Sequence, residues 1–191
     1  ISCRVVHSGV EDRGEFFVGD GSTGTHGWRL INQLQSNVRW TQLDNLHSVP
    51  TDCPQRDERQ GWMADASVSS EEAMHNFGMG SFYAKWLTDM LDVQLTPANE
   101  FHDCSAKNPI GGDCNGTVTD TTPHVPGLFG NRPADPSWGM ALPLVSYFHW
   151  RYYFVGDTDE VRRHLSAVKH YVDWQSRVAA ANEDKLVLFH W

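Results

Sequence analysis

The residues best suited to chemistry lie in one short segment, residues 51–67, which reads TDCPQRDERQGWMADAS. Four acids, two arginines and one tryptophan are interleaved there with Cys, Pro and Gly, which a solvated run of charges seldom contains. Carboxylates and guanidinium groups can bridge the hydroxyls of a neutral sugar, and an indole can cover an apolar ring face. Glycoside cleavage is commonly performed by a pair of carboxylic acids. The segment therefore predicts a polar, sugar-type site.

The composition indicates one folded domain with an acidic balance of charge. The 191 residues carry 15 Lys and Arg against 24 Asp and Glu, a net charge of −9. This disfavours a nucleic-acid partner, because displacing counterions from phosphates requires a basic patch. No apolar run reaches the roughly 18 residues that a membrane-spanning helix requires. We therefore expect neither nucleic acid nor membrane as a partner.

Other chemistries lack their characteristic sequence patterns. The ten histidines show no metal-ligand spacing such as His-Glu-x-x-His, so no metal site is predicted. The sequence has no Gly-rich phosphate loop and no nucleophile elbow, and we expect no cofactor. The eight tryptophans suit carbohydrate stacking, although a helical core can use the same residues.

Two local patterns bear on the cellular compartment. Cys104 and Cys114 flank a Gly-rich segment and can close it as a disulfide, although free thiols are the alternative. Asn115-Gly116-Thr117 follows directly and is an acceptor pattern for N-glycosylation. Together these patterns favour an extracellular, secreted protein.

Hydrophobic periodicity predicts a mainly helical chain after a short β-prone beginning. Residues 1–25 contain short β-prone runs with Gly turns, and a helical period begins at Trp28. Acids after Ser69 predict a helix start there, and further helices are expected over 82–95, 136–156 and 160–181, the last capped by residues 157–159. The stripe expected on the last helix is Val161, Leu165, Val168, Val172 and Val178. The stretch 97–136 is rich in Gly and Pro and is expected to be a functional loop.

The segment from Pro50 to Ala66 closely resembles the hallmark segment of α-L-rhamnosidases of glycoside hydrolase family seventy-eight. The preceding NQLQSNVRWTQLDNLHSVPTD is similar to that family's first barrel helix, and ADPSWGMALPLVSYFHWRYYFVGDTDEV to its later aromatic segment. The resemblance implies an (α/α)6 toroid preceded by β-sandwich domains. Residues 1–25 would then be a β tail or linker of an upstream domain, and residues 26–191 the first half of the toroid. The remainder of the same polypeptide, or a companion fragment, would complete it.

The resemblance also implies roles for the acidic segment. Glu58 would be the general acid of an inverting α-L-rhamnosidase, protonating the leaving oxygen. Asp52, Arg56 and Asp65 would bind rhamnose hydroxyls and influence the charge of Glu58. Trp62 would pack against the apolar face or methyl group of the sugar.

Two further residues are site candidates with alternatives left open. Asp57 is assigned to substrate binding, but family members vary by one residue in this spacing, so Asp57 can replace Glu58 as the acid. Trp138 is a candidate for the wall of the site, although a tryptophan on an aromatic helix is as often part of the core. Arg59 is expected to be a structural ion-pair partner.

The second carboxylate of an inverting pair has no evident candidate. The family's base is a distant downstream glutamate, and no comparable context surrounds any of Glu71, Glu72, Glu100, Glu160 and Glu183. We read Glu71 and Glu72 as first-turn helix acids and expect the base to lie outside this chain. Met140 also stands where the family commonly has Asp. A non-catalytic sugar-binding or structural protein is therefore the alternative, whereas a plain helical interaction module leaves the acidic segment unexplained.

Overall fold

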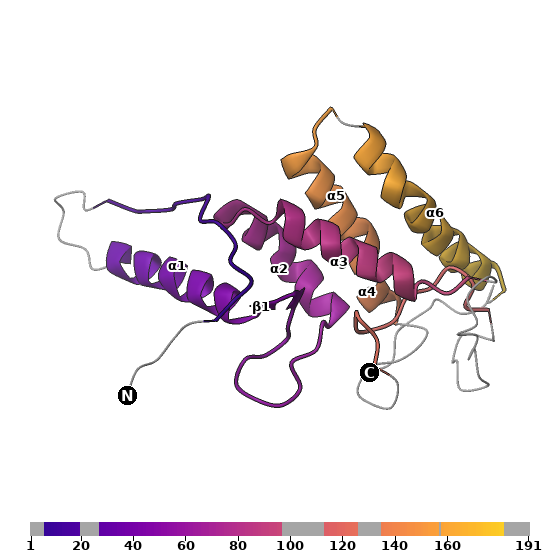
Figure 1. Cartoon of the computed structure of the whole chain (residues 1–191), viewed down its shortest axis with the longest axis horizontal. Coiled ribbons are helices and arrows are strands. Elements are labelled where there is room, and N and C mark those ends of the chain that lie inside the picture. Colours follow the sequence, from indigo (N-terminus) through magenta and orange to yellow (C-terminus); the bar gives the residue numbers. More distant parts are fainter. Residues whose placement is uncertain (1–5, 20–26, 97–112, 126–134, 157, 182–191) are drawn as a thin grey trace.

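The computed structural model describes residues 6–19, 27–96, 113–125, 135–156 and 158–181, and this part of the chain is mainly helical (Figure 1). Its elements are α1 (Gly27–Asp44), β1 (Leu46–His47), β2 (Val49–Pro50), α2 (Met63–Asn76), α3 (Gly80–Val93), α4 (Pro136–Gly139), α5 (Ala141–Tyr153) and α6 (Thr158–Ala181). The two short strands pair antiparallel, with Leu46 opposite Pro50. No helix among the described residues is long and apolar enough to cross a membrane.

The core lies between α2, α3 and α5 and extends to the inward face of α6, which packs beside α5 (Figure 1). Its largest fully buried side chains include Trp86 and Tyr83 of α3 and Trp174 and Tyr171 of α6. Each aromatic removes about 150–250 Å² from water, so these four side chains contribute much of the hydrophobic stabilisation. The expected helices over 82–95 and 136–156 are confirmed, except that Met140 separates α4 from α5.

Successive long helices run back and forth, so alternate connections meet at the same end of the bundle. The loop before α2 and residues 113–125, which precede α4, lie at the same end, where an isolated β-bridge joins Trp62 to Thr121. The amide of Met63 donates to the carbonyl of Asp120 over 2.8 Å, and the amide of Thr122 donates to the carbonyl of Gly61. The fold therefore places the acidic segment beside a segment about sixty residues later in the chain.

The predicted helix start at Ser69 is wrong, because α2 begins six residues earlier, at Met63. The carbonyl of Asp120 accepts from the first amide of the helix, and Asp65 lies in its first turn. A cap supplied by a distant segment leaves no local sequence signal. Glu71 and Glu72 are consequently not first-turn acids but lie in the second half of α2.

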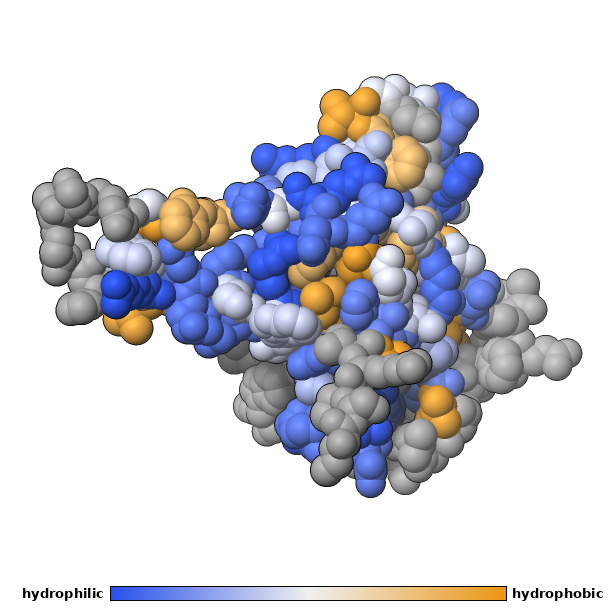
Figure 2. All heavy atoms as spheres, turned by 60° about the vertical axis from the view of Figure 1, so that its left-hand side comes forward, coloured by the Kyte–Doolittle hydropathy of each residue, from blue (hydrophilic) through white to orange (hydrophobic). Residues whose placement is uncertain are grey.

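The predicted helix from Trp28 is confirmed as α1, yet the first part of its apolar stripe faces outward, whereas Leu43 near the end of the helix packs against the core. Leu30, Ile31 and Leu34 are 72%, 44% and 62% exposed. The inward face is polar instead: Gln35 donates to the Asn76 side chain, and Arg39 donates to the carbonyl of Gly14. Figure 2 brings this end of the molecule forward and shows separate orange side chains there among mainly blue ones.

The predicted stripe on α6 is partly wrong. The buried face consists of His164, Ala167, Tyr171, Trp174 and Val178, at spacings of three and four residues. Leu165 and Val172 are instead 54% and 46% exposed. Large aromatics bury more apolar area than β-branched residues, and here they determine which face turns inward.

The described part of the first 25 residues forms no strand pairing beyond a single bridge between Asp12 and Phe77. The chain runs extended past the C-terminal end of α2, where the amides of Arg13 and Gly14 donate to the carbonyl of Asn76. The amide of Gly78 donates in turn to the carbonyl of Glu11 over 2.7 Å. The expected β segment is therefore not seen in residues 6–19, and the domain boundary near residue 25 stays a prediction.

Candidate active site

The acidic segment forms a closed loop between β2 and α2. The amide of Asp52 donates to the carbonyl of Gln60 over 3.0 Å. The Asp52 carboxylate accepts from the amide of Gln60 over 2.8 Å. Asp52 therefore ties the two ends of the loop through both its backbone and its side chain, which is only 4% exposed.

A glycine allows the end of the loop to approach the Thr121–Thr122 segment closely. A Cβ added at Gly61 would lie 2.1 Å from the carbonyl oxygen of Thr122. The same carbonyl accepts from the indole of the buried Trp86 over 2.9 Å. Gly61 is thus required by a backbone contact that anchors the loop to the core.

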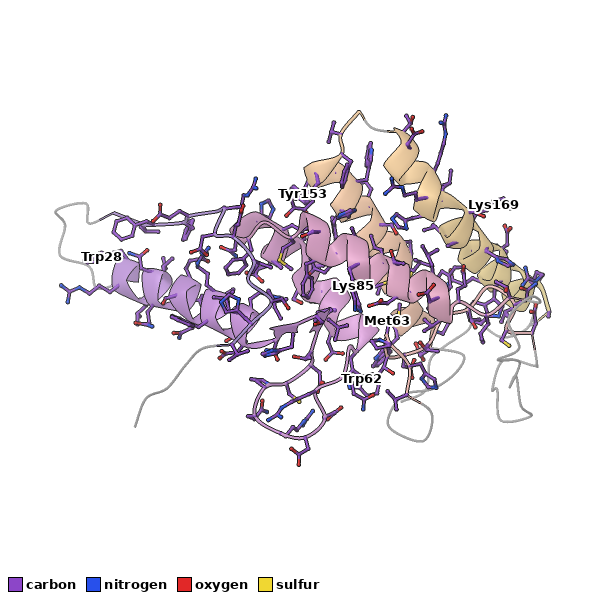
Figure 3. All side chains as sticks on the ribbon, in the orientation of Figure 1. Trp28, Trp62, Met63, Lys85, Tyr153 and Lys169 are labelled. Carbon is purple, nitrogen blue, oxygen red and sulfur yellow. The ribbon has the colours of Figure 1, made fainter. Side chains whose placement is uncertain are left out.

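Glu58 lies at the centre of the loop with both carboxylate oxygens bound. One oxygen accepts from the indole of Trp62 over 2.7 Å. The other is 2.7 Å from the guanidinium of Arg56, which also lies 3.4 Å from the Asp52 carboxylate. One cation therefore bridges two carboxylates, and the structure brings together the four residues Asp52, Arg56, Glu58 and Trp62. Figure 3 shows Trp62 on this loop, beside Met63 at the start of α2.

The remaining charged residues of the loop are placed differently. Asp57 is exposed and forms no hydrogen bond or ion pair with another described residue. Arg59 donates to the carbonyl of Pro54 over 3.3 Å, so the expected ion pair is not found within the described segments. Partial burial, together with the negative charges of Asp52 and Glu58, raises the pKa of Asp65.

Trp138 lies beside Trp62, with ring centroids 6.5 Å apart and an edge-to-face arrangement. The position of Trp138 depends on Asp135, whose carboxylate accepts from the amide of Ser137 at the start of α4. The amide of Asp135 donates to the buried Asp120 carboxylate over 2.9 Å. Since the carbonyl of Asp120 also caps α2, Asp120 links the two tryptophans. Nothing in the sequence indicated that Asp120 connects these segments, apart from its position in the long Gly- and Pro-rich stretch 97–136.

Cys53 is a free, buried thiol next to these groups. Ligand atoms of Asp52, Cys53 and Glu58 lie within 4.8 Å of one another, a geometry that can hold a metal ion. This set contains no histidine, so the spacing of the histidines along the chain gave no indication of it. The contact with the Cys53 side chain, followed by the charge of Glu58, raises the pKa of Arg56. The Arg56 guanidinium therefore serves as the cation of this group in the structure.

The candidate glutamates for the base do not face the loop where they are described. Glu71 accepts from the hydroxyl of Tyr152 over 2.7 Å, and Glu72 accepts from the side chain of Asn76. Both lie in the half of α2 remote from its N-terminus, whereas the loop adjoins the N-terminus. The Glu160 side chain, Glu100 and Glu183 lie outside the described part of the chain.

The family profile described as the bacterial alpha-L-rhamnosidase 6 hairpin glycosidase domain matches residues 25–190. This chain belongs to that family. An alpha-L-rhamnosidase of Formosa agariphila is 29% identical over 169 residues, which are 88% of this chain and 15% of that protein. The chain therefore spans about one seventh of the length of this relative.

Solved structures of rhamnosidases share the fold. The structure of alpha-L-rhamnosidase from Dictyoglumus thermophilum matches 91% of this chain and 16% of its own, with a TM-score of 0.70 and 37% identity. The alpha-L-rhamnosidase of Streptomyces avermitilis, crystallised with L-rhamnose, matches 90% of this chain and 14% of its own, with a TM-score of 0.68 and 27% identity. The predicted mainly helical, six-hairpin fold is confirmed.

Proposed function

We propose that the intact protein releases terminal α-L-rhamnose from glycosides or polysaccharides, with inversion of configuration. The observation that carries this proposal is the Glu58 carboxylate, held between Arg56 and Trp62 beside the buried Asp52. These residues belong to the segment that resembles the family's hallmark.

In the proposed reaction Glu58 in its protonated form gives its proton to the leaving oxygen, and Arg56 and Trp62 stabilise the carboxylate that results. A carboxylate from outside this chain takes a proton from the water that attacks the opposite face of the sugar. An inverting pair is separated by roughly 6.5–9.5 Å, which leaves room for that water. Because Arg56 bridges Glu58 and Asp52, it can release one carboxylate to the substrate while keeping the other. Trp62 and Trp138 would together supply the apolar wall.

Asp57 is the weaker candidate for the acid. Its exposed side chain lacks the partners that fix the Glu58 carboxylate. Asp65, on the first turn of α2, would add a third carboxylate near the sugar hydroxyls. Partial burial, with a contribution from the negative charges of Asp52 and Glu58, raises the pKa of Asp65, which fits a residue close to both carboxylates.

The remainder of the polypeptide, or a companion fragment, would supply the base and complete the toroid. An extracellular location is part of the proposal, and a disulfide at Cys114 supports it, because structural disulfides persist in oxidising compartments. Cys104, the expected partner, lies outside the described residues, so that pairing stays a prediction.

The proposal is tested by incubating the intact protein with an aryl α-L-rhamnoside and following the products by ¹H NMR. We expect rhamnose to appear first as the β anomer, which mutarotates afterwards. Initial appearance of the α anomer would contradict inversion. Absence of any release, in a protein that still binds L-rhamnose, would contradict hydrolysis.

A non-catalytic sugar-binding protein is the second candidate, because Met140 replaces a common aspartate of the family. Met140 is 38% exposed and directly follows the α4 turn that contains Trp138. Replacing Met140 with Asp would restore that carboxylate near the tryptophan pair. A large gain of rhamnose release in Met140→Asp, from an inactive parent, would favour the binding-protein interpretation of the natural sequence.

A further inference from the structure

A hollow with a cavity volume of about 680 Å³ lies apart from the acidic loop 51–62. Its walls come from residues 8–13, from Ser48 between the two strands, from the α2–α3 junction and from Tyr153 at the end of α5. None of the residues that line it belongs to the loop 51–62. Figure 3 labels two lining residues, Lys85 on α3 and Tyr153 near the end of α5, and shows Tyr153 at the opposite side of the helices from Trp62. We call it the Ser8–Tyr153 hollow.

Backbone hydrogen bonds fix the walls of this hollow. The amide of Ser8 donates to the carbonyl of Leu46, and the Ser8 hydroxyl accepts from the amide of Ser48, both over 2.7 Å. Tyr153 accepts from the amide of Met79 over 2.8 Å through its hydroxyl oxygen. The site is therefore shaped before any ligand arrives, which lowers the cost of binding.

Two glycines at the α2–α3 junction, Gly78 and Gly80, keep the hollow open because neither carries a side chain that would fill it. A Cβ added at Gly78 would lie 3.2 Å from Nε of Arg13 and 3.5 Å from Cβ of Glu11. A Cβ at Gly80 would lie 3.4 Å from the ring of Tyr153. The two glycines thus let charged side chains and an aromatic ring border the same space.

The charges around the hollow balance one another. Arg13 is 3.0 Å from the Glu11 carboxylate, and Lys85 pairs with Asp89 one turn further along α3. Since Arg13 and Lys85 are each paired with a carboxylate, a phosphate or carboxylate ligand would gain little electrostatic binding energy in the hollow. The same groups, with the hydroxyls of Ser48 and Ser81, offer both donors and acceptors to a ligand rich in hydroxyls, whereas the Ser8 hydroxyl already donates to the carbonyl of Leu46.

We propose that the Ser8–Tyr153 hollow binds one or two neutral saccharide residues, as an accessory site separate from the acidic loop. Its volume lies within the roughly 300–1,000 Å³ of small-molecule sites. Tyr153 borders the space with an aromatic ring and can cover an apolar sugar face. The proposal goes beyond the proposed function, because it requires no hydrolysis and uses none of the residues assigned to it.

The test compares two tryptophan substitutions in the intact protein carrying Trp62→Ala, which weakens sugar binding at the acidic loop. Ser81→Trp places an indole in the hollow from an exposed position in the first turn of α3. Thr88→Trp, also exposed on α3 but outside the hollow, is the matched control. The probes are L-rhamnose, D-glucose and inorganic phosphate, measured by ligand-observed NMR titration.

We expect at least one of the two sugars to bind, with a dissociation constant raised about tenfold or more by Ser81→Trp and unchanged by Thr88→Trp. If Ser81→Trp does not fold, Glu11→Gln combined with Lys85→Gln replaces it, with the same expected direction. Equal sugar binding in the hollow variant and its control would overturn the proposal. Loss of phosphate binding alone would also overturn it, in favour of an anion site.

Discussion

Two helices of this chain, α1 and α3, have similar amphipathic patterns but opposite environments. The apolar stripe of α3 is buried, with Tyr83, Trp86 and Leu87 fully enclosed. The first part of the α1 stripe, Leu30, Ile31 and Leu34, is exposed. The polar side of α1 faces the protein, where Arg39 also lies 4.6 Å from the centre of the Phe77 ring. Periodicity therefore shows that a helix has an apolar face, but not whether the partner of that face is within the same chain.

The largest expected effect concerns the chain on its own. Residues 1–191 produced alone expose the stripe of α1 together with Leu165 and Val172 of α6, and we expect them to self-associate or to lack a cooperative unfolding transition. Light scattering and urea unfolding measure both properties. Leu30→Gln with Leu34→Gln should lower the scattering. A monomer that unfolds cooperatively would show that these faces need no further cover.

The next largest effect separates the two stripes directly. In the intact protein Trp86→Ala should lower the free energy of unfolding by about 3–5 kcal/mol, because it empties a buried volume. It also removes the hydrogen bond to the carbonyl of Thr122. Trp86→Phe keeps most of the volume and should cost less.

The matched change on α1 tests whether its stripe is covered in the intact protein. If it stays exposed, Leu34→Ala changes the free energy of unfolding by about 0.5 kcal/mol or less. A cost of about 2 kcal/mol or more would indicate burial against the rest of the domain. Urea denaturation of both variants makes the comparison.

An effect between those of Trp86→Ala and an exposed Leu34→Ala is expected from the polar side of α1. Arg39 donates to the carbonyl of Gly14 and to the side chains of Asn76 and Asp12. Arg39→Ala should therefore cost about 1–3 kcal/mol, since it leaves acceptors without their donor. Arg29→Ala, at an exposed position on the same helix, is the control. Equal stability of the two variants would mean that the polar face of α1 does not hold it in place.

The smallest effect concerns Asp113, which links the 113–125 segment to α6. The hydrogen bond from Arg177 holds the pKa of Asp113 below its usual 3.8. A lowered pKa in the folded state stabilises the fold above the unfolded value, and this contribution is lost as the pH falls through the lowered pKa. Because both side chains are over 40% exposed, screening limits the contribution to about 0.2–1 kcal/mol. Asp113→Asn should therefore destabilise at neutral pH, and its effect should shrink as the pH falls below 3.8, as measured by urea unfolding over that pH range.

Local patterns predicted the helices well where the signal was local. The periods of α1 and α3 and the aromatic content of α5 gave their positions within a few residues. The start of α2 and the inward face of α6 were missed, because each depends on a distant partner. For α2 that partner is the carbonyl of Asp120, and for α6 it is the surface of α5.

In the candidate site, too, the residue types were predictable from the sequence but the contacts between them were not. The residue types of the 51–67 segment predicted a sugar-type site, and the resemblance narrowed it to a family to which the chain belongs. The contacts that bind Glu58 to Arg56 and Trp62 were not predictable, because they depend on how the loop closes through Asp52 and Gln60. Nor was the role of Asp120 predictable, because its hydrogen bonds with Met63 and Asp135 connect segments far apart in the sequence.

The most direct test of the central claim is the rate of rhamnose release by the intact protein, compared between Glu58→Gln and Asp57→Asn. Each change replaces one carboxylate by its amide, and the residues are adjacent. Loss of a general acid typically costs about 10²–10⁴-fold, and we expect that loss in Glu58→Gln and a much smaller change in Asp57→Asn. Full activity of Glu58→Gln, or the larger loss in Asp57→Asn, would contradict the assignment of Glu58 as the proton donor.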